Sequence, residues 1–291
     1  PWRTNIVRPI VAPDAGGGFS FCRPAATSDM VARMTHPGPT DDGATTHFGF
    51  ADVPVGEKTA RVGAVFDSVA RRYDLMNDLM SGGAHRLWKA AFVSRLVLRP
   101  HTRVLDVAGG TGDIAFRILD RLDGAARVTV CDINREMLGV GATRAIDRGH
   151  LPVDGTIDWV CGNAEALPFA DMSVDTYTIA FGLRNVTHID RALAEARRVL
   201  RPGGRLFCLE FSRVAVPLLG ELYDRYSFAI LPRIGQFVAG DRDAYQYLVE
   251  SIRRFPPQDA LLAKMAEAGL ARGRYENLSG GIVAIHSGWR L

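Results

Sequence analysis

A glycine-rich turn near the middle of the chain could hold a nucleotide-type ligand. It spans residues 106–113 (Asp-Val-Ala-Gly-Gly-Thr-Gly-Asp), between the predicted strand Arg103–Val107 and the predicted helix Ile114–Leu122. Gly110 and its neighbours let a ligand approach the backbone closely, and the first turn of a helix offers unpaired N–H groups. The alternative is a tight strand-to-helix turn that binds no ligand.

Acidic residues around this turn indicate which ligand fits. Asp132 ends the second predicted strand, where a carboxylate can accept hydrogen bonds from both ribose hydroxyls of an adenosine. Asp106 precedes the glycines, and a carboxylate there suits a cationic amino-acid end and a sulfonium but repels a pyrophosphate. Position 113 is Asp and not the third glycine of the dinucleotide fingerprint. S-adenosylmethionine is therefore favoured as the cofactor, and NAD is the alternative.

A third loop completes the predicted binding edge. Residues 162–169 (Gly-Asn-Ala-Glu-Ala-Leu-Pro-Phe) follow the predicted strand Ile157–Cys161. Asn163 and the backbone of Ala164 can hydrogen-bond the edge of an adenine, while apolar neighbours cover its faces. A plain surface turn is the alternative, and the position of the loop beside the other two elements disfavours it.

The elements that must position these loops alternate between strand and helix. Strands are predicted at 103–107, 127–131, 157–161, 174–180 and 205–211, with helices at 114–122, 134–148 and 188–200. This alternation is typical of a parallel sheet with helices on both faces. Two closing strands, about 270–277 and 282–287, are separated by a Ser-Gly-Gly hairpin signal, so the last strand is predicted to be antiparallel. The predicted fold is α/β and Rossmann-like, with seven strands.

The regions outside this core have other patterns. Residues 44–100 are predicted to form a helical lid with helices at 57–80 and 84–98, ahead of a cofactor-binding core at 101–212. Residues 213–256 are predicted to be an aromatic-rich, substrate-side insertion that is broken by prolines. A closing helix (257–268) and the hairpin complete residues 257–291.

Residues 1–43 are rich in proline and glycine and show no apolar periodicity, so they are predicted to be disordered. The chain does not begin with Met, although Met30 and Met34 lie inside this segment. Three interpretations stay open: an over-extended gene start, a processing or expression remnant, or an organellar transit peptide. Asp14 and Asp29 disfavour the last of these.

Composition excludes several classes of protein. The chain is 47% hydrophobic and 23% charged, which is ordinary for a globular protein, and 35 basic against 32 acidic residues give a net charge of only +3. This balance disfavours nucleic acid as the main partner. The four cysteines form no C-x-x-C pair, so neither a metal site nor a disulfide framework is predicted. No apolar run approaches the roughly 18 residues of a membrane-spanning helix.

The motifs together resemble a known family. Residues 106–113, Asp132, 163–169 and 202–204 resemble the class I S-adenosylmethionine-dependent methyltransferases. A closer similarity, from about residue 45 to the C-terminus, is to the ubiquinone/menaquinone biosynthesis C-methyltransferases, the UbiE family. It is carried by residues 46–50 (THFGF), 73–78 (YDLMND), 85–89 (HRLWK), 181–186 (FGLRNV) and 231–235 (LPRIG).

The resemblance implies a substrate and a set of cofactor contacts. The substrate would be a polyprenyl quinol, either 2-polyprenyl-6-methoxy-1,4-benzoquinol or demethylmenaquinol, and its ring would gain a methyl group. The family's cofactor contacts correspond to Thr111, Asp132, Asn163 and Ala164, alongside Asp106 and Gly110 of the glycine-rich turn. The family often has serine before the FGLRN motif, and this chain has Ala180, so one hydroxyl contact is lost.

Methylation of a ring carbon requires a residue that stabilises a phenolate or accepts the hydroxyl proton. Arg184 is too basic to accept a proton, but it can stabilise the phenolate or orient a water, and Asn185 can hydrogen-bond a ring oxygen. Tyr73 is a third candidate catalytic residue, on the predicted lid, with core packing as its alternative role. His188 and Glu210 remain open as candidate bases.

The predicted partners follow from this chemistry. The aromatic stretch 214–250 could receive the isoprenoid tail and rest on a membrane surface, or it could be a lid or a homodimer face without lipid contact. We expect a cytoplasmic protein of bacterial origin that can associate peripherally with the inner membrane or with a quinone-biosynthesis assembly, and a mitochondrial-matrix protein is the less favoured alternative. The alternative function is a class I methyltransferase that acts on another small aromatic or lipid substrate, with an oxidoreductase and a non-enzymatic scaffold less favoured.

Overall fold

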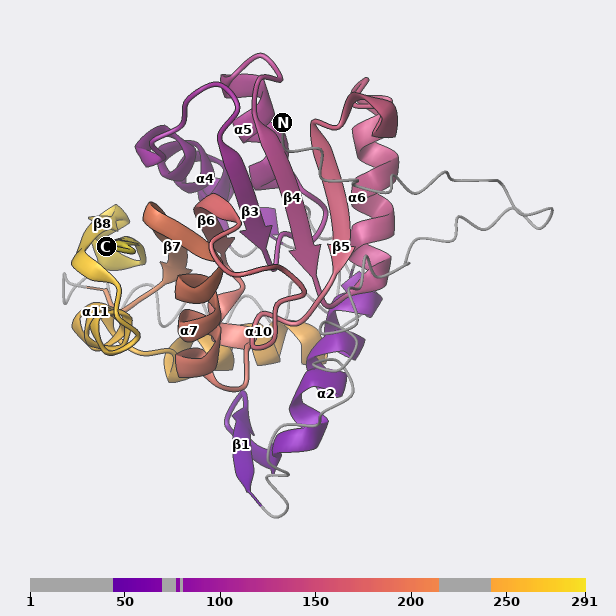
Figure 1. Ribbon diagram of the computed structural model, residues 1–291. Coiled ribbons are helices and arrows are strands. Elements are labelled where there is room, and N and C mark those ends of the chain that lie inside the picture. The colour runs from indigo at the N-terminus through magenta and orange to yellow at the C-terminus, as the bar shows by residue number, and fades with distance from the viewer. Residues whose placement is uncertain (1–43, 70–76, 79–80, 215–241) are drawn as a thin grey trace. The chain divides into compact units, whose positions relative to one another are not determined.

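The computed structural model describes residues 44–69, 77–78, 81–214 and 242–291 (Figure 1). These residues all belong to one compact unit, Gly43–Leu291. The predicted tail 1–43, Tyr73 and most of the predicted insertion therefore lie outside the described residues. None of the described helices combines the length and the apolar character that crossing a membrane requires.

The described residues form one sheet of seven strands in the order β5-β4-β3-β6-β7-β9-β8, together with a separate two-stranded hairpin. The strands are β3 (Arg103–Val107), β4 (Arg127–Asp132), β5 (Ile157–Cys161), β6 (Val174–Ala180), β7 (Leu200–Phe211), β8 (Ala271–Leu278) and β9 (Val283–Trp289). Neighbouring strands from β5 to β7 are parallel, and β9 is antiparallel to both β7 and β8. The predicted α/β fold with an antiparallel last strand is confirmed.

The order of the strands reverses direction beside β3. The chain runs from β3 outward to β4 and β5 and then returns to the other side of β3 as β6. The loops that follow β3 and β6 therefore leave the same edge of the sheet in opposite directions. Ligands of open α/β sheets bind at this kind of reversal, outside the carboxyl ends of the strands.

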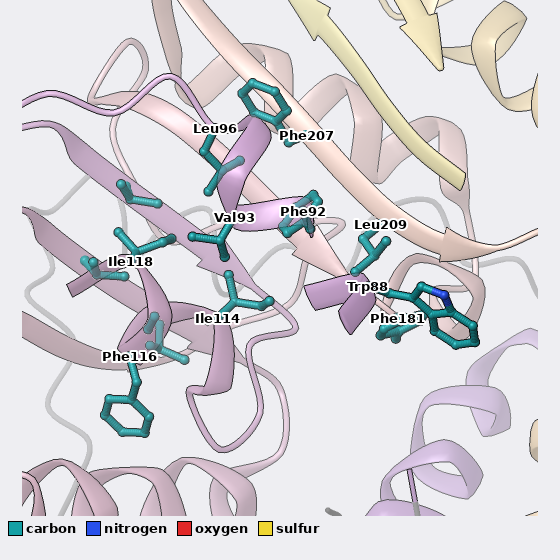
Figure 2. Packing of buried hydrophobic residues seen from close by; sticks show 14 of the residues in the cluster. Trp88, Phe92, Val93, Leu96, Ile114, Phe116, Ile118, Phe181, Phe207 and Leu209 are labelled. Atoms are coloured by element: carbon teal, nitrogen blue, oxygen red, sulfur yellow. The ribbon is translucent and has the colours of Figure 1, made fainter. Parts of the chain in front are cut away.

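Helices cover both faces of the sheet because the strand side chains alternate between them. On β7, Phe207 and Leu209 belong to one apolar cluster, and Leu206 and Cys208 belong to a second. Figure 2 shows the first cluster, which contains residues of α4 (Ala84–Arg95) and α5 (Asp113–Arg121) together with Phe207 and Leu209. The second cluster contains residues of α7 (Ile189–Val199) and α11 (Gln258–Glu267). The helix α6 (Arg135–Asp147) runs beside β5 (Figure 1).

Strand β7 begins five residues before the predicted start at Arg205. The pairing of β6 with β7 shifts between Val174 and Thr176, which face Leu200 and Arg205 respectively. The Pro-Gly-Gly segment at 202–204 therefore lies inside the strand, at an irregularity in its pairing with β6. Most of the other predicted strand boundaries are confirmed to within a residue or two.

An N-terminal hairpin was not predicted. Strands β1 (Thr45–Phe48) and β2 (Ala51–Pro54) pair antiparallel and lead into α2 (Val55–Val69). The hairpin contacts α10 (Arg242–Arg254), because the ring of Phe48 stacks on that of Tyr247 with 4.3 Å between centroids. The structure therefore joins the beginning of the described unit to a helix near its end.

Candidate active site

The glycine-rich turn begins at a buried carboxylate. Asp106 lies in β3 and is fully buried, and its Oδ1 accepts a hydrogen bond of 2.7 Å from the Thr178 hydroxyl on β6. Its Oδ2 has no hydrogen-bond partner among the residues that the structure describes. Burial raises the pKa of Asp106 to about 7, against the smaller opposing effect of the Thr178 hydrogen bond. A cation placed beside Oδ2 would favour the ionised carboxylate.

The glycines of the turn keep side chains out of this space. A Cβ on Gly109 would lie 2.8 Å from Asp106 Oδ2 and 2.7 Å from a methyl of Val130. Gly110 has a φ of +53°, a left-handed conformation that glycine adopts without strain. The helix α5 begins directly after the turn, with Gly112 as its N-cap residue.

Asp132 lies at the end of β4, where its carboxylate faces the turn. Its Oδ2 accepts a hydrogen bond of 2.8 Å from the Gly110 N–H, and its Oδ1 accepts one from the Asn134 N–H. Each oxygen retains a second lone pair for a ligand hydroxyl. Burial raises the pKa of Asp132, although these backbone N–H groups oppose the shift.

Thr111 is buried, and its hydroxyl lies 3.1 Å from a guanidinium nitrogen of Arg144, which donates to it. Thr111, a predicted cofactor contact, therefore lies in the turn, and its hydroxyl is hydrogen-bonded to Arg144 of α6. At the other end of the turn, Asp113 accepts hydrogen bonds from Arg117 and forms an ion pair of 2.8 Å with the buried Lys89 of α4. The bond from Arg144 of α6 to Thr111 and the ion pair between Lys89 of α4 and Asp113 hold the turn between these two helices.

The loop after β5 lies beside Asp132, whose backbone carbonyl accepts a hydrogen bond from the Gly162 N–H. Asn163 is exposed, and its Oδ1 accepts the Glu165 N–H at 2.9 Å, which closes a local turn. Ala164 is buried. The three loops predicted to bind the cofactor therefore share one edge of the sheet.

The turn after β6 lies against the glycine-rich turn. The close approach is at Gly182, where an added Cβ would lie 2.4 Å from the Cβ of Ala108 in the glycine-rich turn. Phe181 precedes it with a φ of +57° and is anchored in the core, where its ring lies 4.9 Å from that of Phe211. This contact brings Arg184 and Asn185, in the 3-10 helix η3 (Leu183–Asn185), close to the predicted cofactor edge.

Arg184 forms a buried ion pair with Glu210 of β7, at 2.8 Å between Nη1 and Oε1. The same guanidinium donates to the Phe181 carbonyl, and Glu210 also accepts the backbone N–H groups of Arg184 and Phe211. A carboxylate that is engaged in this way is a poor proton acceptor. The geometry therefore disfavours Glu210 as the base. Its negative charge also balances the positive charge of Arg184, which was predicted to stabilise the phenolate.

Two residues that sequence reasoning did not assign to the site hold the rest of this turn. The hydroxyl of Tyr247 on α10 donates to Asn185 Oδ1 at 3.1 Å, and the amine of Lys58 on α2 donates to the Val186 carbonyl at 3.0 Å. Lys58 is 1% exposed, and burial lowers the pKa of its amine, partly opposed by Glu165. Lys58 lies four residues before Val62, on the apolar face of α2. This spacing was the sequence signal that could have predicted its burial.

His188 is the residue before α7, and its Nδ1 lies 2.8 Å from Oε2 of Glu165. Glu165 also accepts the backbone N–H groups of Thr187 and His188. The carboxylate thereby joins the loop after β5 to the segment after η3. His188 stays open as a candidate base, and Tyr73 stays a prediction because it lies outside the described residues.

The site has no metal character in the part of the chain that the structure describes. No three residues among the histidines, cysteines and acids there are grouped so that they could hold a metal ion.

Comparisons with known proteins identify the family. Residues 55–290 match the model of the ubiE/COQ5 methyltransferase family. A ubiquinone/menaquinone biosynthesis C-methyltransferase of Methylobacterium nodulans is 60% identical over 254 residues, which are 86% of this chain and 98% of the relative. Proteins with the same name from Paracoccus denitrificans and Rhodopseudomonas palustris (strain HaA2) are 59% and 57% identical, over 86% and 87% of this chain and 99% and 100% of their own lengths.

Solved structures share the fold at low sequence identity. An S-adenosylmethionine-dependent methyltransferase of Thermotoga maritima, described as a possible histamine N-methyltransferase, has a TM-score of 0.53 and 19% identity over 78% of this chain and all of its own. The [4+2]-cyclase SpnF matches equally well, with a TM-score of 0.53 and 20% identity over 79% of this chain and 94% of its own. Because a cyclase has the same fold, the fold alone does not define the reaction. The match to the family model and the near full-length similarity to its members do define the family: this chain belongs to the ubiE/COQ5 methyltransferases.

Proposed function

We propose that this protein transfers a methyl group from S-adenosylmethionine to a ring carbon of a polyprenyl quinol, in ubiquinone or menaquinone biosynthesis. The benzoquinol and the naphthoquinol named above are both candidate substrates. Membership of the family and the names of its 57–60% identical members support this reaction. The observation that carries it in the structure is the contact between Gly182 and Ala108, which places the turn bearing Arg184 and Asn185 against the glycine-rich turn.

The residues present fit S-adenosylmethionine. The buried Oδ2 of Asp106, which has no partner among the described residues, suits the cationic amino-acid end of the cofactor. Asp132 is held by backbone N–H groups, with lone pairs left for the ribose hydroxyls. Asn163 and Ala164 of the neighbouring loop remain the predicted contacts of the adenine edge. Gly109 and Gly110 leave the space that a Cβ would fill. When bound, the cofactor supplies an electrophilic methyl group on a sulfonium.

The second half of the site acts on the quinol. Asn185 hydrogen-bonds the ring oxygen, on which negative charge develops as its proton passes to a base, with His188 as the open candidate. This stabilisation makes the neighbouring ring carbon nucleophilic. That carbon would gain the methyl group as the methyl–sulfur bond breaks and would then lose its own hydrogen as a proton, so that the products are the methylated quinol, S-adenosylhomocysteine and a proton. Arg184, with its charge balanced by Glu210, holds the Phe181 carbonyl and fixes the turn that carries Asn185. Positioning of the ring against the methyl donor supplies much of the rate, because the reaction is an in-line displacement.

The partners that we propose follow from this substrate. An uncharged quinol with an isoprenoid tail resides in a membrane, so the protein must meet it at the membrane surface. The aromatic residues between 214 and 250 remain the predicted channel for the tail, and those between 215 and 241 lie outside the described residues.

The deciding experiment is an assay with S-adenosylmethionine and a short-chain demethylated quinol, followed by the mass and the NMR spectrum of the product. We expect the gain of one methyl group on ring carbon. No such product with either a benzoquinol or a naphthoquinol would exclude the proposed function. A thermal-shift comparison of S-adenosylmethionine with NADH is the companion measurement, and stabilisation by NADH alone would exclude the cofactor.

A further inference from the structure

The amide of Asn185 is held at one end. Its Oδ1 accepts the hydrogen bond from Tyr247, a residue 62 positions further along the chain. A carboxamide has an acceptor oxygen at one end and two N–H donors at the other. A bond that engages the oxygen therefore leaves the N–H donors available to another partner, and Asn185 is only half-buried.

Tyr247 is itself tightly held. It is 4% exposed, and its ring stacks on Phe48 with an interplanar angle of 18°. Burial raises the pKa of Tyr247 to about 12, so the hydroxyl keeps its proton at neutral pH and remains a donor. In the structure this hydroxyl donates to Asn185 Oδ1, and the bond holds the amide with its N–H donors turned away from the tyrosine.

The N-terminal hairpin sets the position of Tyr247. One turn further along α10, Glu250 accepts the backbone N–H of Phe50 at 2.9 Å, and Arg254 donates to the carbonyl of the same residue. Residues 247, 250 and 254 lie on one face of the helix, since they are spaced by three and four residues. The hairpin thus fixes α10 along the face that presents the Tyr247 hydroxyl to Asn185.

We propose that Tyr247 is a positioning residue that turns the Asn185 amide so that its N–H donors meet the quinol oxygen. This inference rests on the proposed function and assigns the acceptor end of the amide to the protein and the donor end to the substrate. Negative charge on the oxygen is stabilised by an N–H donor and repelled by a carbonyl oxygen. An amide that is free to rotate spends part of its time in the repulsive orientation, which lowers the rate but not the affinity for the cofactor.

The test compares Tyr247→Phe with Tyr275→Phe, a matched change on β8, at the far edge of the sheet. We expect Tyr247→Phe to lower kcat about 3- to 10-fold, the equivalent of one neutral hydrogen bond. The KM for a short-chain quinol and the Kd of S-adenosylmethionine, measured by calorimetry, should change less than about twofold. Tyr275→Phe should match the wild type.

Variants of Asn185 separate orientation from simple packing. Tyr247→Phe combined with Asn185→Ala should be no slower than Asn185→Ala alone, because the tyrosine acts through the amide. Asn185→Asp, which offers no N–H donor, should be slower than Asn185→Ala. Circular dichroism melting of each variant, with assays well below its Tm, removes any effect of unfolding.

Three results would overturn the inference. The first is an unchanged kcat in Tyr247→Phe. The second is a double variant whose loss of kcat equals the product of the losses in Tyr247→Phe and Asn185→Ala. The third is an Asn185→Asp variant at least as fast as Asn185→Ala. If the wild type methylates the quinol and one of these results is found, only this inference fails. If the wild type methylates no quinol, the proposed function fails first and this inference fails with it.

Discussion

The guanidinium of Arg184 and the carboxylate of Glu210 form an ion pair at 2.8 Å in which both side chains are almost fully buried. The pair joins the turn after β6 to the neighbouring strand β7. The next two residues of the chain are held from other directions, Asn185 by α10 and Val186 by α2. Three consecutive residues beside the cofactor edge are thus fixed by three different elements.

Neutralising one member of this pair should destabilise the protein. Glu210→Gln leaves the Arg184 charge buried without a counter-charge, and Arg184→Met does the same to Glu210, so each should lower the free energy of unfolding by about 3–5 kcal/mol. The double variant Arg184→Met, Glu210→Gln should lose much less than the sum, because no unpaired charge remains. Urea unfolding of the four proteins measures this coupling.

The double variant also separates folding from catalysis. We expect it to bind S-adenosylmethionine but to methylate slowly, because the turn that carries Asn185 is no longer fixed. Additive losses of stability in the urea series would contradict the assignment of a buried, coupled pair.

Lys58 should affect the rate more than the stability. Lys58→Met fills a similar volume and removes a buried charge, while Glu165 keeps its hydrogen bonds to Thr187 and His188. Water can reach the half-buried Val186, so the free energy of unfolding should change by less than about 1 kcal/mol. The loss of the hydrogen bond to Val186 should lower kcat about 2- to 10-fold at an unchanged Kd for the cofactor. Steady-state kinetics and calorimetry give the two quantities.

Lys264→Met is the matched control for this change, since Lys264 pairs with Asp190 on the surface. It should leave kcat unchanged. A Lys58→Met enzyme with wild-type kcat would show that α2 does not position the turn.

The sequence predicted which strand ends meet at the candidate cofactor edge, because the information there is local. A carboxylate before the glycines, Asp132 at the end of the next strand and Asn163 after the third all follow apolar runs that are short and clearly bounded. In a parallel sheet the carboxyl ends of neighbouring strands meet, so strand assignment alone brings these residues together. The antiparallel last strand followed from its hairpin signal in the same way.

The substrate half was less predictable because its contacts join residues far apart in the chain. Arg184 was identified from a motif, but its partner Glu210 lies 26 residues away and was considered only as a candidate base. Tyr247 was visible as one aromatic residue among several, and nothing local indicated that it bonds to Asn185 across 62 positions. Lys58 stood on an apolar helix face, where periodicity predicts burial but not which carbonyl a buried amine will meet.

The glycine-rich turn gives a steric prediction with an internal control. Gly109→Ala would place a methyl group 2.7 Å from Val130 and 2.8 Å from Asp106 Oδ2, so the backbone must shift at a cost of about 1–3 kcal/mol. The affinity for S-adenosylmethionine should fall as a result of this shift.

Gly139→Ala in α6 is the control, because a Cβ there meets no atom of the described residues within 4 Å. This change should raise stability by up to about 1 kcal/mol. Urea unfolding and calorimetry test both; equal behaviour of the two variants would contradict the close approach at Gly109.

The buried Asp106 should make stability depend on pH. Its pKa is about 7 in the folded protein against a usual value of 3.8, so between these values the folded state keeps a proton that the unfolded state has lost. The free energy of unfolding should therefore fall as the pH rises from about 4 to 7 on this account, and level off above. Asp106→Asn should remove this part of the slope. Urea unfolding at several pH values compares the two proteins, and identical slopes would contradict the raised pKa.

The same carboxylate should couple cofactor binding to a proton. A cationic amino group beside Oδ2 favours the ionised form of Asp106, so binding of S-adenosylmethionine or S-adenosylhomocysteine should release a proton below pH 7. Affinity should then rise by at most about tenfold per unit between roughly pH 5 and 7 and become flat above, until the ligand amine itself deprotonates near pH 8. Calorimetry in two buffers of different ionisation enthalpy counts the released protons.

Asp106→Asn should bind more weakly and release fewer protons than the wild type, while the contribution of Asp132, whose pKa is also raised, should persist in both proteins. Equal proton release by the two proteins would show that the cation of the cofactor does not lie beside Asp106.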